Sequence, residues 1–266
     1  RRYVRSAAPD DDAAAVARGL SGRKVLVTIA FADPEATDWQ IRLVRRYIRH
    51  DVHLVADNST DADAAAAIRQ VAARHDVPYI RLPCSRSHTM ALTGPHPSRS
   101  HGMALNWVWY NVIGPGEPAA VAFLDDDLFP TAAEDPFAPL AGQDFYGVVR
   151  WAGARWFLWA GYCVFNCHAV AGQRLDFRPD WFIGLDTGGG NWEPLYRHAD
   201  IARLQRPSWT QSSLEPTSGQ QGEDYVQWCN GWLHEVGAGN RLDAAAQAHK
   251  RTVVAALLAP HLAATG

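Results

Sequence analysis

Apolar runs of strand length alternate with amphipathic stretches through the first half of the chain. The predicted strands are 24–31, 52–56, 77–82 and 120–125, and the predicted helices are 36–50, 62–75 and 99–112. In the first of these helices Ile41, Val44 and Ile48 fall on one face, and four arginines fall on the other. Strands and helices that alternate in this way predict an α/β fold, in which a mostly parallel sheet carries helices on both faces.

The second half of the chain has a more aromatic pattern. Its strand candidates, 144–151 and 156–166, are longer and contain tryptophans, and they are followed by loops and short helices. A last helix is predicted at 242–258. With 47% hydrophobic residues in 266, the chain can bury a full core, so we expect one domain over 1–266.

The most informative stretch is the apolar run that ends in Asp125, Asp126 and Asp127. Ligands of α/β sheets bind at the carboxyl ends of the strands, so these acids stand where a site is expected. In an extended segment, Asp125 and Asp127 would point to one side and Asp126 to the other. Two carboxylates on one side suit Mn²⁺ or Mg²⁺. The alternative is an acidic turn that caps a strand or begins a helix.

Composition and charge argue against several classes of protein. The net charge of -3 and the scattered basic residues do not indicate nucleic-acid binding. No run approaches the roughly 18 to 20 apolar residues of a membrane helix, and no secretory signal opens the chain, so we expect a cytoplasmic protein without an integral membrane segment. The four cysteines form no pair of CxxC motifs and are predicted to be free thiols rather than a zinc site.

Glycines are informative both where they are absent and where they cluster. There is no GxGxxG after the first strand and no GxxxxGK[ST] anywhere, so the dinucleotide-binding fingerprint and the P-loop are absent. Gly188, Gly189 and Gly190 follow shortly after Asp186. Three successive glycines indicate unusual backbone angles or a close approach to a ligand, with a plain flexible turn as the alternative.

Taken together, these segments resemble a family 2-like glycosyltransferase with the GT-A fold, a nucleotide-diphospho-sugar transferase. The resemblance rests on VLVTIAF in the first strand, Asp-Asn-Ser-Thr-Asp after the second strand, the helix around 98–106, and FLDDDLFP. It covers 24–130 well and the second half loosely. It implies a Rossmann-like, mostly parallel sheet, with a nucleotide-sugar-binding half at 24–130 and an aromatic-rich acceptor-binding half at 131–266.

The resemblance also implies a set of donor-binding residues. They are Ala30, Phe31, Asp57, Asn58, Arg99, Asn106, Asp125, Asp126 and Arg241. Asp57 would accept a hydrogen bond from the base or ribose, and Arg241 would meet the diphosphate. A diphosphate leaving group needs its developing charge neutralised, which a divalent ion and a guanidinium can do.

Three residues are implied as metal ligands. Asp125 and Asp127 look like the outer members of the family's DxD motif, with Asp127 on the metal and Asp125 near the ribose or the water shell of the metal. His234 looks like the late histidine that completes the coordination of Mn²⁺ or Mg²⁺ in many such enzymes. The alternative for a lone histidine is a packed or surface position.

An inverting transfer needs a carboxylate that takes the proton from the acceptor hydroxyl. Asp186 is the predicted base and Glu223 and Asp224 are the reserve pair, because Asp186-Thr187 stands where the family's common Glu-Asp pair would be sought. The predicted acceptor-binding residues are Trp151, Trp192, Gly188 and Gly189. Five tryptophans offer flat surfaces for stacking a sugar ring, or else belong to the core: Trp151, Trp156, Trp159, Trp181 and Trp192.

We therefore expect a metal-dependent, hexosyltransferase-like glycosyltransferase that moves a sugar from a nucleotide-diphospho-sugar to an acceptor hydroxyl with inversion. Two alternatives stay open. A sugar-phosphate nucleotidyltransferase normally carries a glycine-rich phosphate loop after the first strand, where this chain has Ala32-Asp33-Pro34-Glu35. A non-catalytic nucleotide-sugar-binding module would keep the pocket and lose the base.

Overall fold

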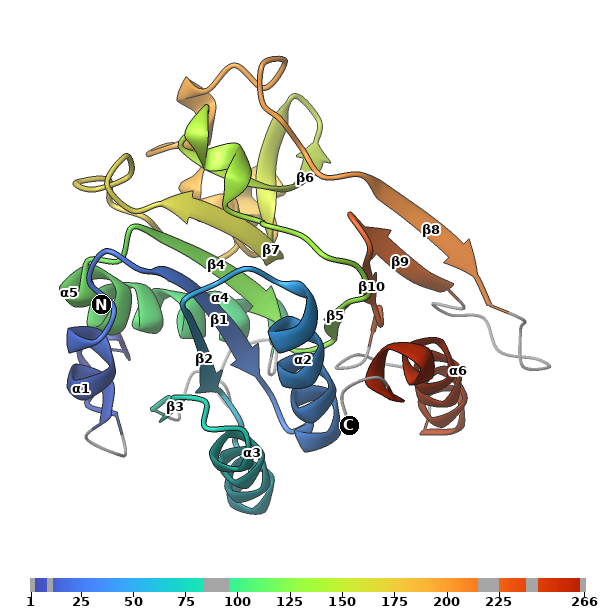
Figure 1. The fold of residues 1–266 in the computed structure, drawn as a ribbon. Coiled ribbons are helices and arrows are strands. Elements are labelled where there is room, and N and C mark those ends of the chain that lie inside the picture. The colour runs from blue at the N-terminus through green and yellow to red at the C-terminus, as the bar shows by residue number, and fades with distance from the viewer. Residues whose placement is uncertain (1–2, 9–11, 84–95, 215–224, 238–243, 264–266) are drawn as a thin grey trace.

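A six-stranded sheet lies at the centre of the protein, in the order β3-β2-β1-β4-β7-β6 (Figure 1). The computed structural model describes residues 3–8, 12–83, 96–214, 225–237 and 244–263. The strands of this sheet are β1 (Lys24–Ala30), β2 (Val52–Asp57), β3 (Tyr79–Arg81), β4 (Ala120–Asp125), β6 (Phe145–Ala152) and β7 (Arg155–Asn166). Strands β1, β2, β3 and β4 pair in parallel, and the β6–β7 hairpin joins β4 antiparallel. The predicted α/β fold, with the first and fourth strands side by side in one mostly parallel sheet, is confirmed.

Helices cover both faces of the sheet because the residues of β1 alternate between two cores. The covering helices are α1 (Asp12–Arg18), α2 (Pro34–Tyr47), α3 (Ala62–Arg74) and α4 (Pro97–Val108). Val25 and Val27 pack into a core that includes residues of α1 and α4. Leu26 and Ala30 point to the opposite face, where they pack with residues of α2 and α3. Figure 1 shows α2 and α4 on opposite sides of the sheet.

Helices α2 and α3 begin directly at the carboxyl ends of β1 and β2 because aspartates cap them. Asp33 Oδ1 accepts a hydrogen bond from Ala36 N at 2.9 Å, and Asp61 Oδ1 accepts one from Ala64 N at 2.8 Å. Each cap satisfies an amide group that has no partner inside the helix. The short connections keep both strand ends at one edge of the sheet.

Several shorter helical segments join these elements. They are η1 (Tyr3–Arg5), the π-helical η3 (Trp109–Ile113) that continues α4, α5 (Gly114–Gly116), η4 (Ala138–Ala141), η5 (Trp181–Ile183), η6 (Gly189–Asn191) and η7 (Tyr196–His198). The last three lie in the acceptor-side half predicted from the sequence. That half is rich in ring contacts, as predicted: Trp156, for example, packs against Tyr196 with ring centroids 5.2 Å apart.

Helix α4 packs closely against a later loop segment. A Cβ built on Gly102 would lie 2.5 Å from Phe177 O and 2.8 Å from Arg178 Cα. One turn further along, the Asn106 amide donates from Nδ2 to Asp176 Oδ1 at 2.8 Å and accepts from Phe177 N at 3.0 Å. The absence of a side chain at Gly102 and the double hydrogen bond of Asn106 therefore fix this segment against α4.

We expect Gly102→Ala to lower the free energy of unfolding by about 1–3 kcal/mol, because the new methyl group would overlap backbone atoms. The expected sign is opposite to helix propensity, which favours Ala over Gly by about 1 kcal/mol. Urea denaturation measures the effect. Gly142→Ala is the matched control, since a Cβ there meets no atom within 4 Å. A Gly102→Ala protein as stable as the control would contradict the close packing.

A second, antiparallel sheet in the order β5-β10-β9-β8 adjoins the first. Its strands are β5 (Leu128–Pro130), β8 (Trp209–Ser213), β9 (Tyr225–Cys229) and β10 (Trp232–His234). The sequence analysis does not predict this sheet, because two of its strands have three residues and show no measurable periodicity. Strands β9 and β10 form a hairpin whose turn residues, Asn230 and Gly231, have φ of 46° and 80°. Asn-Gly is typical of such a turn.

Glu134 connects the two sheets. Its carboxylate accepts hydrogen bonds from Tyr162 OH of β7 at 3.1 Å and from Asn230 Nδ2 at 2.9 Å, and it also accepts from Trp232 Nε1 of β10. Burial raises the pKa of Glu134, and the three hydrogen bonds oppose that shift. The Glu134 carboxylate thus accepts three hydrogen bonds and links the two sheets.

Helix α6 (Ala244–Ala263) docks beside α2 and β10. The Arg251 guanidinium lies 2.6 Å from Asp33 Oδ2 and 3.1 Å from Glu235 Oε1. Its carbon lies 5.4 Å from the centroid of the Trp39 ring. Because Asp33 caps α2 and Glu235 follows β10, one arginine holds the last helix to both elements.

Cys163, Cys167 and Cys229 are free thiols, as the sequence predicts, and Cys84 lies outside the described residues. Burial raises the pKa of Cys163 and Cys229, and it raises the pKa of Cys167 to about 12. Thiols with such pKa values stay protonated near neutral pH, so they are poor metal ligands and nucleophiles.

Candidate active site

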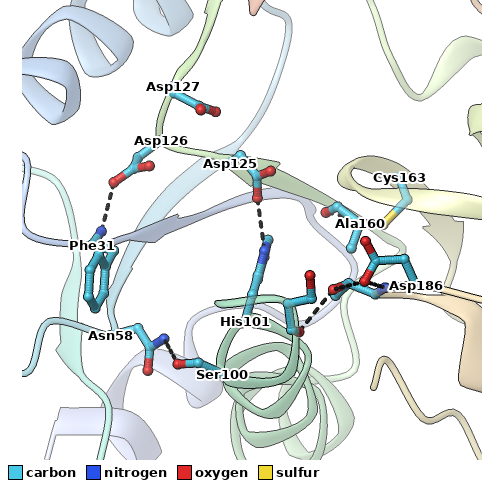
Figure 2. Close-up of polar contacts among 12 residues, drawn as sticks. Phe31, Asn58, Ser100, His101, Asp125, Asp126, Asp127, Ala160, Cys163 and Asp186 are labelled. Carbon is cyan, nitrogen blue, oxygen red and sulfur yellow. Dashed lines mark hydrogen bonds and ion pairs between the residues drawn. The ribbon is translucent and has the colours of Figure 1, made fainter. Parts of the chain in front are cut away.

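Three adjacent aspartates lie where the two sheets meet. Strand β4 ends at Asp125, and β5 begins at Leu128. Between them, Asp126 and Asp127 form a turn. Asp126 and Asp127 lie in a turn and not in extended backbone, so strand alternation does not fix their directions. Asp125 and Asp127 nevertheless both act on His101 and on His234, whereas Asp126 turns to Phe31. The predicted placement of Asp125 and Asp127 on one side stays a prediction. The three carboxylates diverge, and each meets a different part of the protein (Figure 2).

Asp125 forms a buried pair with His101 of α4, whose Nδ1 lies 3.2 Å from Asp125 Oδ1. Gly161 of β7 makes room for the carboxylate, since a Cβ there would lie 2.3 Å from Asp125 Oδ2. Burial, followed by the charge of Asp127, raises the pKa of Asp125 to about 8. Burial lowers the pKa of His101 to about 4. Burial thus favours the uncharged form of both side chains, and His101 Nε2 has no hydrogen-bond partner in the described part of the chain.

Asp126 joins the end of β4 to the end of β1. Its Oδ2 accepts a hydrogen bond from Phe31 N at 2.7 Å. The Phe31 ring is 46% exposed, and an exposed ring at a strand end offers a surface on which a nucleotide base can stack. Asn58, at the end of β2, donates from Nδ2 to Ser100 Oγ at 3.1 Å, and its buried Oδ1 has no partner among the residues described. Phe31 and Asn58 thus both offer an unused binding group.

Asp127 faces His234 across the junction of the two sheets, with 3.5 Å between Asp127 Oδ1 and His234 Nε2. Both side chains are almost buried, with exposures of 15% and 9%. His234 Nδ1 lies 3.1 Å from the side-chain oxygen of Gln227. In the neutral tautomer that donates from Nδ1 to this oxygen, Nε2 presents a lone pair toward Asp127. Asp127 Oδ1 has no hydrogen-bond partner in the described ranges. Either a proton on His234 Nε2 or a cation bound by both side chains satisfies this pair.

The chemistry of Asp127 and His234 fits Mn²⁺, which accepts both carboxylate oxygen and imidazole nitrogen. Among residues 3–8, 12–83, 96–214, 225–237 and 244–263, no group of three His, Cys, Asp or Glu side chains could hold a metal ion by itself. A metal on this pair would therefore take its remaining ligands from water or from a bound molecule. Phosphate oxygens are common ligands of that kind.

Asp57 and Ala30 lie side by side at the ends of β2 and β1, both fully buried. Asp57 Oδ1 accepts from Ser59 N at 2.8 Å, and Oδ2 accepts from Tyr79 OH at 2.7 Å. The protein itself thus engages both oxygens of Asp57, and its role toward a nucleotide stays a prediction. The same holds for Asn106, whose amide binds the backbone and side chain of the segment packed on α4.

Asp186 is exposed and is anchored to the first turn of α4. Its Oδ1 accepts from Thr187 N at 2.8 Å, and Thr187 Oγ1 donates to Ser98 O at 2.9 Å. No described residue donates a hydrogen bond to Asp186 Oδ2. The charges of Asp127 and Asp186 oppose the burial that lowers the pKa of His101, so both carboxylates act on this buried imidazole. Figure 2 shows Asp186 beside His101, with a free oxygen that can accept a proton from a hydroxyl.

The glycine run makes its close approaches to the protein itself. Gly188 has φ of 96°, and a Cβ on it would lie 2.5 Å from Leu158 O. A Cβ on Gly189 would lie 2.2 Å from the Leu185 side chain. These contacts explain the glycines by packing, since only Gly tolerates both the backbone angle and the contact. Binding of an acceptor by Gly188 and Gly189 stays a prediction.

The two tryptophans predicted to bind an acceptor have different surroundings. Trp151, at the end of β6, is 57% exposed. Trp192 is half-buried and meets the ring of Trp156 edge to face, with centroids 6.4 Å apart. Trp192 therefore belongs largely to the core. Arg99 lines a separate pocket with Trp181, and Arg241, Glu223 and Asp224 lie outside the described residues.

His101 and Gly161 are site residues that were not predicted from the sequence, and Trp181 was predicted only as one of five tryptophans that either stack on a sugar ring or belong to the core. His101 lies within the helix 98–106 that carries part of the resemblance, but only the tertiary structure brings it to Asp125. Gly161 interrupts an aromatic strand, and an isolated Gly in a strand is a signal of close approach that could have been used. Trp181 had no local signal that separates it from the core tryptophans.

No protein-family model matches the chain, and no curated protein matches it. Three solved structures show remote similarity. The mannosyltransferase PcManGT from Pyrobaculum calidifontis, in complex with GDP-Man and Mn²⁺, is 11% identical over 65% of this chain, with a TM-score of 0.39. The mannosyltransferase Ktr4p from S. cerevisiae is 8% identical over 62%, with a TM-score of 0.39. The glycosyltransferase GlyE in Streptococcus pneumoniae TIGR4 is 14% identical over 56%, with a TM-score of 0.32.

The matched regions cover 52%, 60% and 35% of these three proteins, so the chain spans about half the length of the first of them. The similarities are remote, and the residues of the site are therefore the basis for the function proposed below. None of the helices in the described ranges has the length and apolar character needed to cross a membrane.

Proposed function

We propose that this chain is a metal-dependent glycosyltransferase that moves a sugar from a nucleotide-diphospho-sugar to an acceptor hydroxyl with inversion. The observation that carries the proposal is the buried pair of Asp127 and His234, 3.5 Å apart at the carboxyl end of a parallel strand. This is the edge at which ligands of α/β sheets bind. The pair has the donor atoms for Mn²⁺ and leaves coordination positions for a diphosphate.

The other side chains at this edge have the chemistry that a sugar donor and an acceptor need. The exposed Phe31 ring offers a stacking surface for the base, and Asn58 Oδ1 offers an unused acceptor for a ribose or base group. Asp127 and His234 would hold Mn²⁺ or Mg²⁺, which neutralises the charge that develops on the diphosphate leaving group. Asp186 would take the proton from the acceptor hydroxyl as that hydroxyl attacks the anomeric carbon.

The proposal is tested by measuring the binding of Mn²⁺ in the presence of UDP or GDP. Electron paramagnetic resonance and calorimetry are the two methods of measurement. We expect Asp127→Asn and His234→Ala each to weaken Mn²⁺ binding by at least roughly 10- to 100-fold. This is the loss seen when a residue that hydrogen-bonds to a metal ligand is removed, and removal of the ligand itself should cost no less. Circular dichroism checks that the variants fold. The matched control is Asp63→Asn, which changes an exposed carboxylate on α3.

Mn²⁺ and nucleotide binding that is equal in wild type and Asp127→Asn would rule out the proposed metal site. Assays of transfer from UDP-, GDP- and dTDP-sugars then separate the possible functions. Binding of metal and nucleotide without sugar transfer or donor hydrolysis would point to a non-catalytic nucleotide-sugar-binding module. Release of pyrophosphate from a nucleoside triphosphate and a sugar phosphate would point to a nucleotidyltransferase.

A further inference from the structure

Two aromatic rings project from the surface on the short helix η5. Trp181 is 48% exposed, with the ring of His96 packed against it at a centroid distance of 4.4 Å, and Phe182 is fully exposed, which is unusual for adjacent large apolar residues. The loop that carries them is closed at its base, because the amides of Asp180 and Leu185 each donate to the other residue's carbonyl oxygen at 2.9 Å. Gly184, with φ of 77°, makes the return turn. The rings are therefore presented on a fixed loop, and exposed apolar groups of this kind mark interaction sites.

The same loop forms one side of a pocket of about 430 Å³, which is in the size range of small-molecule sites. Among the residues that the structure describes, the pocket is lined by Arg99 of α4 and by Arg178, Pro179, Asp180, Trp181 and Phe182. Close packing of α4 on this segment at Gly102 fixes the pocket wall. The pocket thus combines exposed ring faces with charged side chains on a rigid frame.

The charges in the pocket select for a ligand with both hydrogen-bond donors and acceptors. Arg178 is paired with Asp176, with 2.5 Å between Nη2 and Oδ2. Arg99 and Asp180 form no side-chain ion pair or hydrogen bond with any residue that the structure describes. A purely anionic ligand would be opposed by Asp180, and a purely cationic one by the arginines. A neutral, polyhydroxylated ring satisfies both groups and places its C–H face on an aromatic ring.

The pocket and the candidate base Asp186 both contact the first turn of α4, the pocket through Arg99 and the base through Thr187. Thr187 Oγ1 binds Ser98 O, next to Arg99, and thereby holds Asp186 to this turn. A molecule bound against Arg99 therefore lies on the helix turn that also positions Asp186. The pocket is separate from the Asp127 and His234 pair, which lies at the junction of the two sheets.

We propose that this pocket binds a saccharide ring of the acceptor, stacked on Trp181 and hydrogen-bonded by Arg99 and Asp180. The inference rests on the proposed function, and it narrows the acceptor from any hydroxyl compound to a carbohydrate. It also replaces Trp192, which is packed in the core, with Trp181 as the stacking residue.

The test is saturable binding of the methyl glycosides of glucose, galactose, mannose and N-acetylglucosamine, measured by saturation-transfer NMR and tryptophan fluorescence. Sorbitol, which has the hydroxyls without a ring face, is the ligand control. At least one glycoside is expected to bind with a Kd on the order of 1–10 mM, the weak affinity of a small ligand. Trp181→Leu should weaken binding about 3- to 10-fold, and Trp181→Phe, which keeps a ring, should restore part of the loss. Arg99→Gln and Asp180→Asn should also weaken it.

Leu257→Ala, at an exposed apolar position on α6, is the protein control and should bind the glycoside as wild type does. Absence of any glycoside binding above that of sorbitol, or equal binding by Trp181→Leu, would overturn the inference. So would a dimer that Trp181→Leu dissociates, because the rings would then serve contacts between copies. Mn²⁺ binding with UDP or GDP is measured on the same variants. If Mn²⁺ binding persists in these variants and no glycoside binds, only this inference fails. If glycosides bind and Asp127→Asn leaves Mn²⁺ binding intact, only the proposed function fails.

Discussion

Asp186→Asn is expected to lower the turnover number of sugar transfer by about 10²- to 10⁴-fold, the usual contribution of a general base. The amide keeps the size of the side chain and can still accept from Thr187 N through its oxygen. It cannot take a proton from a hydroxyl. Donor and Mn²⁺ binding should stay nearly unchanged, because the residues proposed to bind them lie at the ends of β1 and β2, in the turn after β4 and on β10. Steady-state kinetics together with calorimetry of Mn²⁺ and UDP or GDP separate the two effects.

The matched control for this prediction is Asp144→Asn, which changes an exposed carboxylate just before β6 and should leave turnover unchanged. Near-normal turnover in Asp186→Asn would exclude Asp186 as the base. A product that retains the anomeric configuration of the donor would exclude the inverting mechanism itself. In either case Glu223 and Asp224, which lie outside the described residues, are the next candidates.

Glu134→Ala is expected to destabilise the protein by about 1–3 kcal/mol, the cost of leaving buried hydrogen-bond donors without an acceptor. The substitution leaves the donors of Tyr162, Asn230 and Trp232 without their acceptor, and buried donors without partners are costly. It also removes the link between the two sheets. Urea denaturation followed by circular dichroism and tryptophan fluorescence measures the loss.

Two comparisons sharpen this second prediction. Glu134→Gln keeps one acceptor oxygen and should lose less stability than Glu134→Ala. Glu193→Ala removes an exposed glutamate that is paired with Arg197 on the surface, and it should change stability by less than about 1 kcal/mol. Equal stabilities of Glu134→Ala and Glu193→Ala would show that the Glu134 network does not hold the sheets together.

The parallel part of the fold was predictable because its signals are local. The run 24–31 is apolar on both faces, and Ile41, Val44 and Ile48 mark one face of the helix that follows it, so type and order of the elements could be predicted from periodicity. The second sheet was not predictable in this way. A three-residue strand such as Leu128–Pro130 has too few positions for a pattern, and only the Asn230-Gly231 turn gave a local sign of a hairpin.

The candidate site was predictable only in part. The sequence predicts that Asp127 follows the end of a strand. The resemblance implies that His234 lies near it, and in the structure His234 Nε2 lies 3.5 Å from Asp127 Oδ1. The direction of each carboxylate depends on a turn after Asp125, and the pairing of Asp125 with His101 depends on contacts across the fold. Such contacts leave no periodic trace in the sequence.

The turn of Asp126 and Asp127 has a mechanical consequence, because it is the only covalent step between β4 and β5. The chain also crosses between the sheets in the longer connections from β5 to β6 and from β7 to β8, but this two-residue turn is the shortest crossing and therefore the natural pivot for a rotation of one sheet against the other. The distance between Asp125 and His101 lies on one side of the pivot, whereas the distance between Asp127 and His234 spans it. If the protein adopts a second state, a change in the Asp127–His234 distance would measure the change in the angle between the sheets. The Asp125–His101 distance, which lies within the first sheet and its helix, would stay constant and serve as the reference.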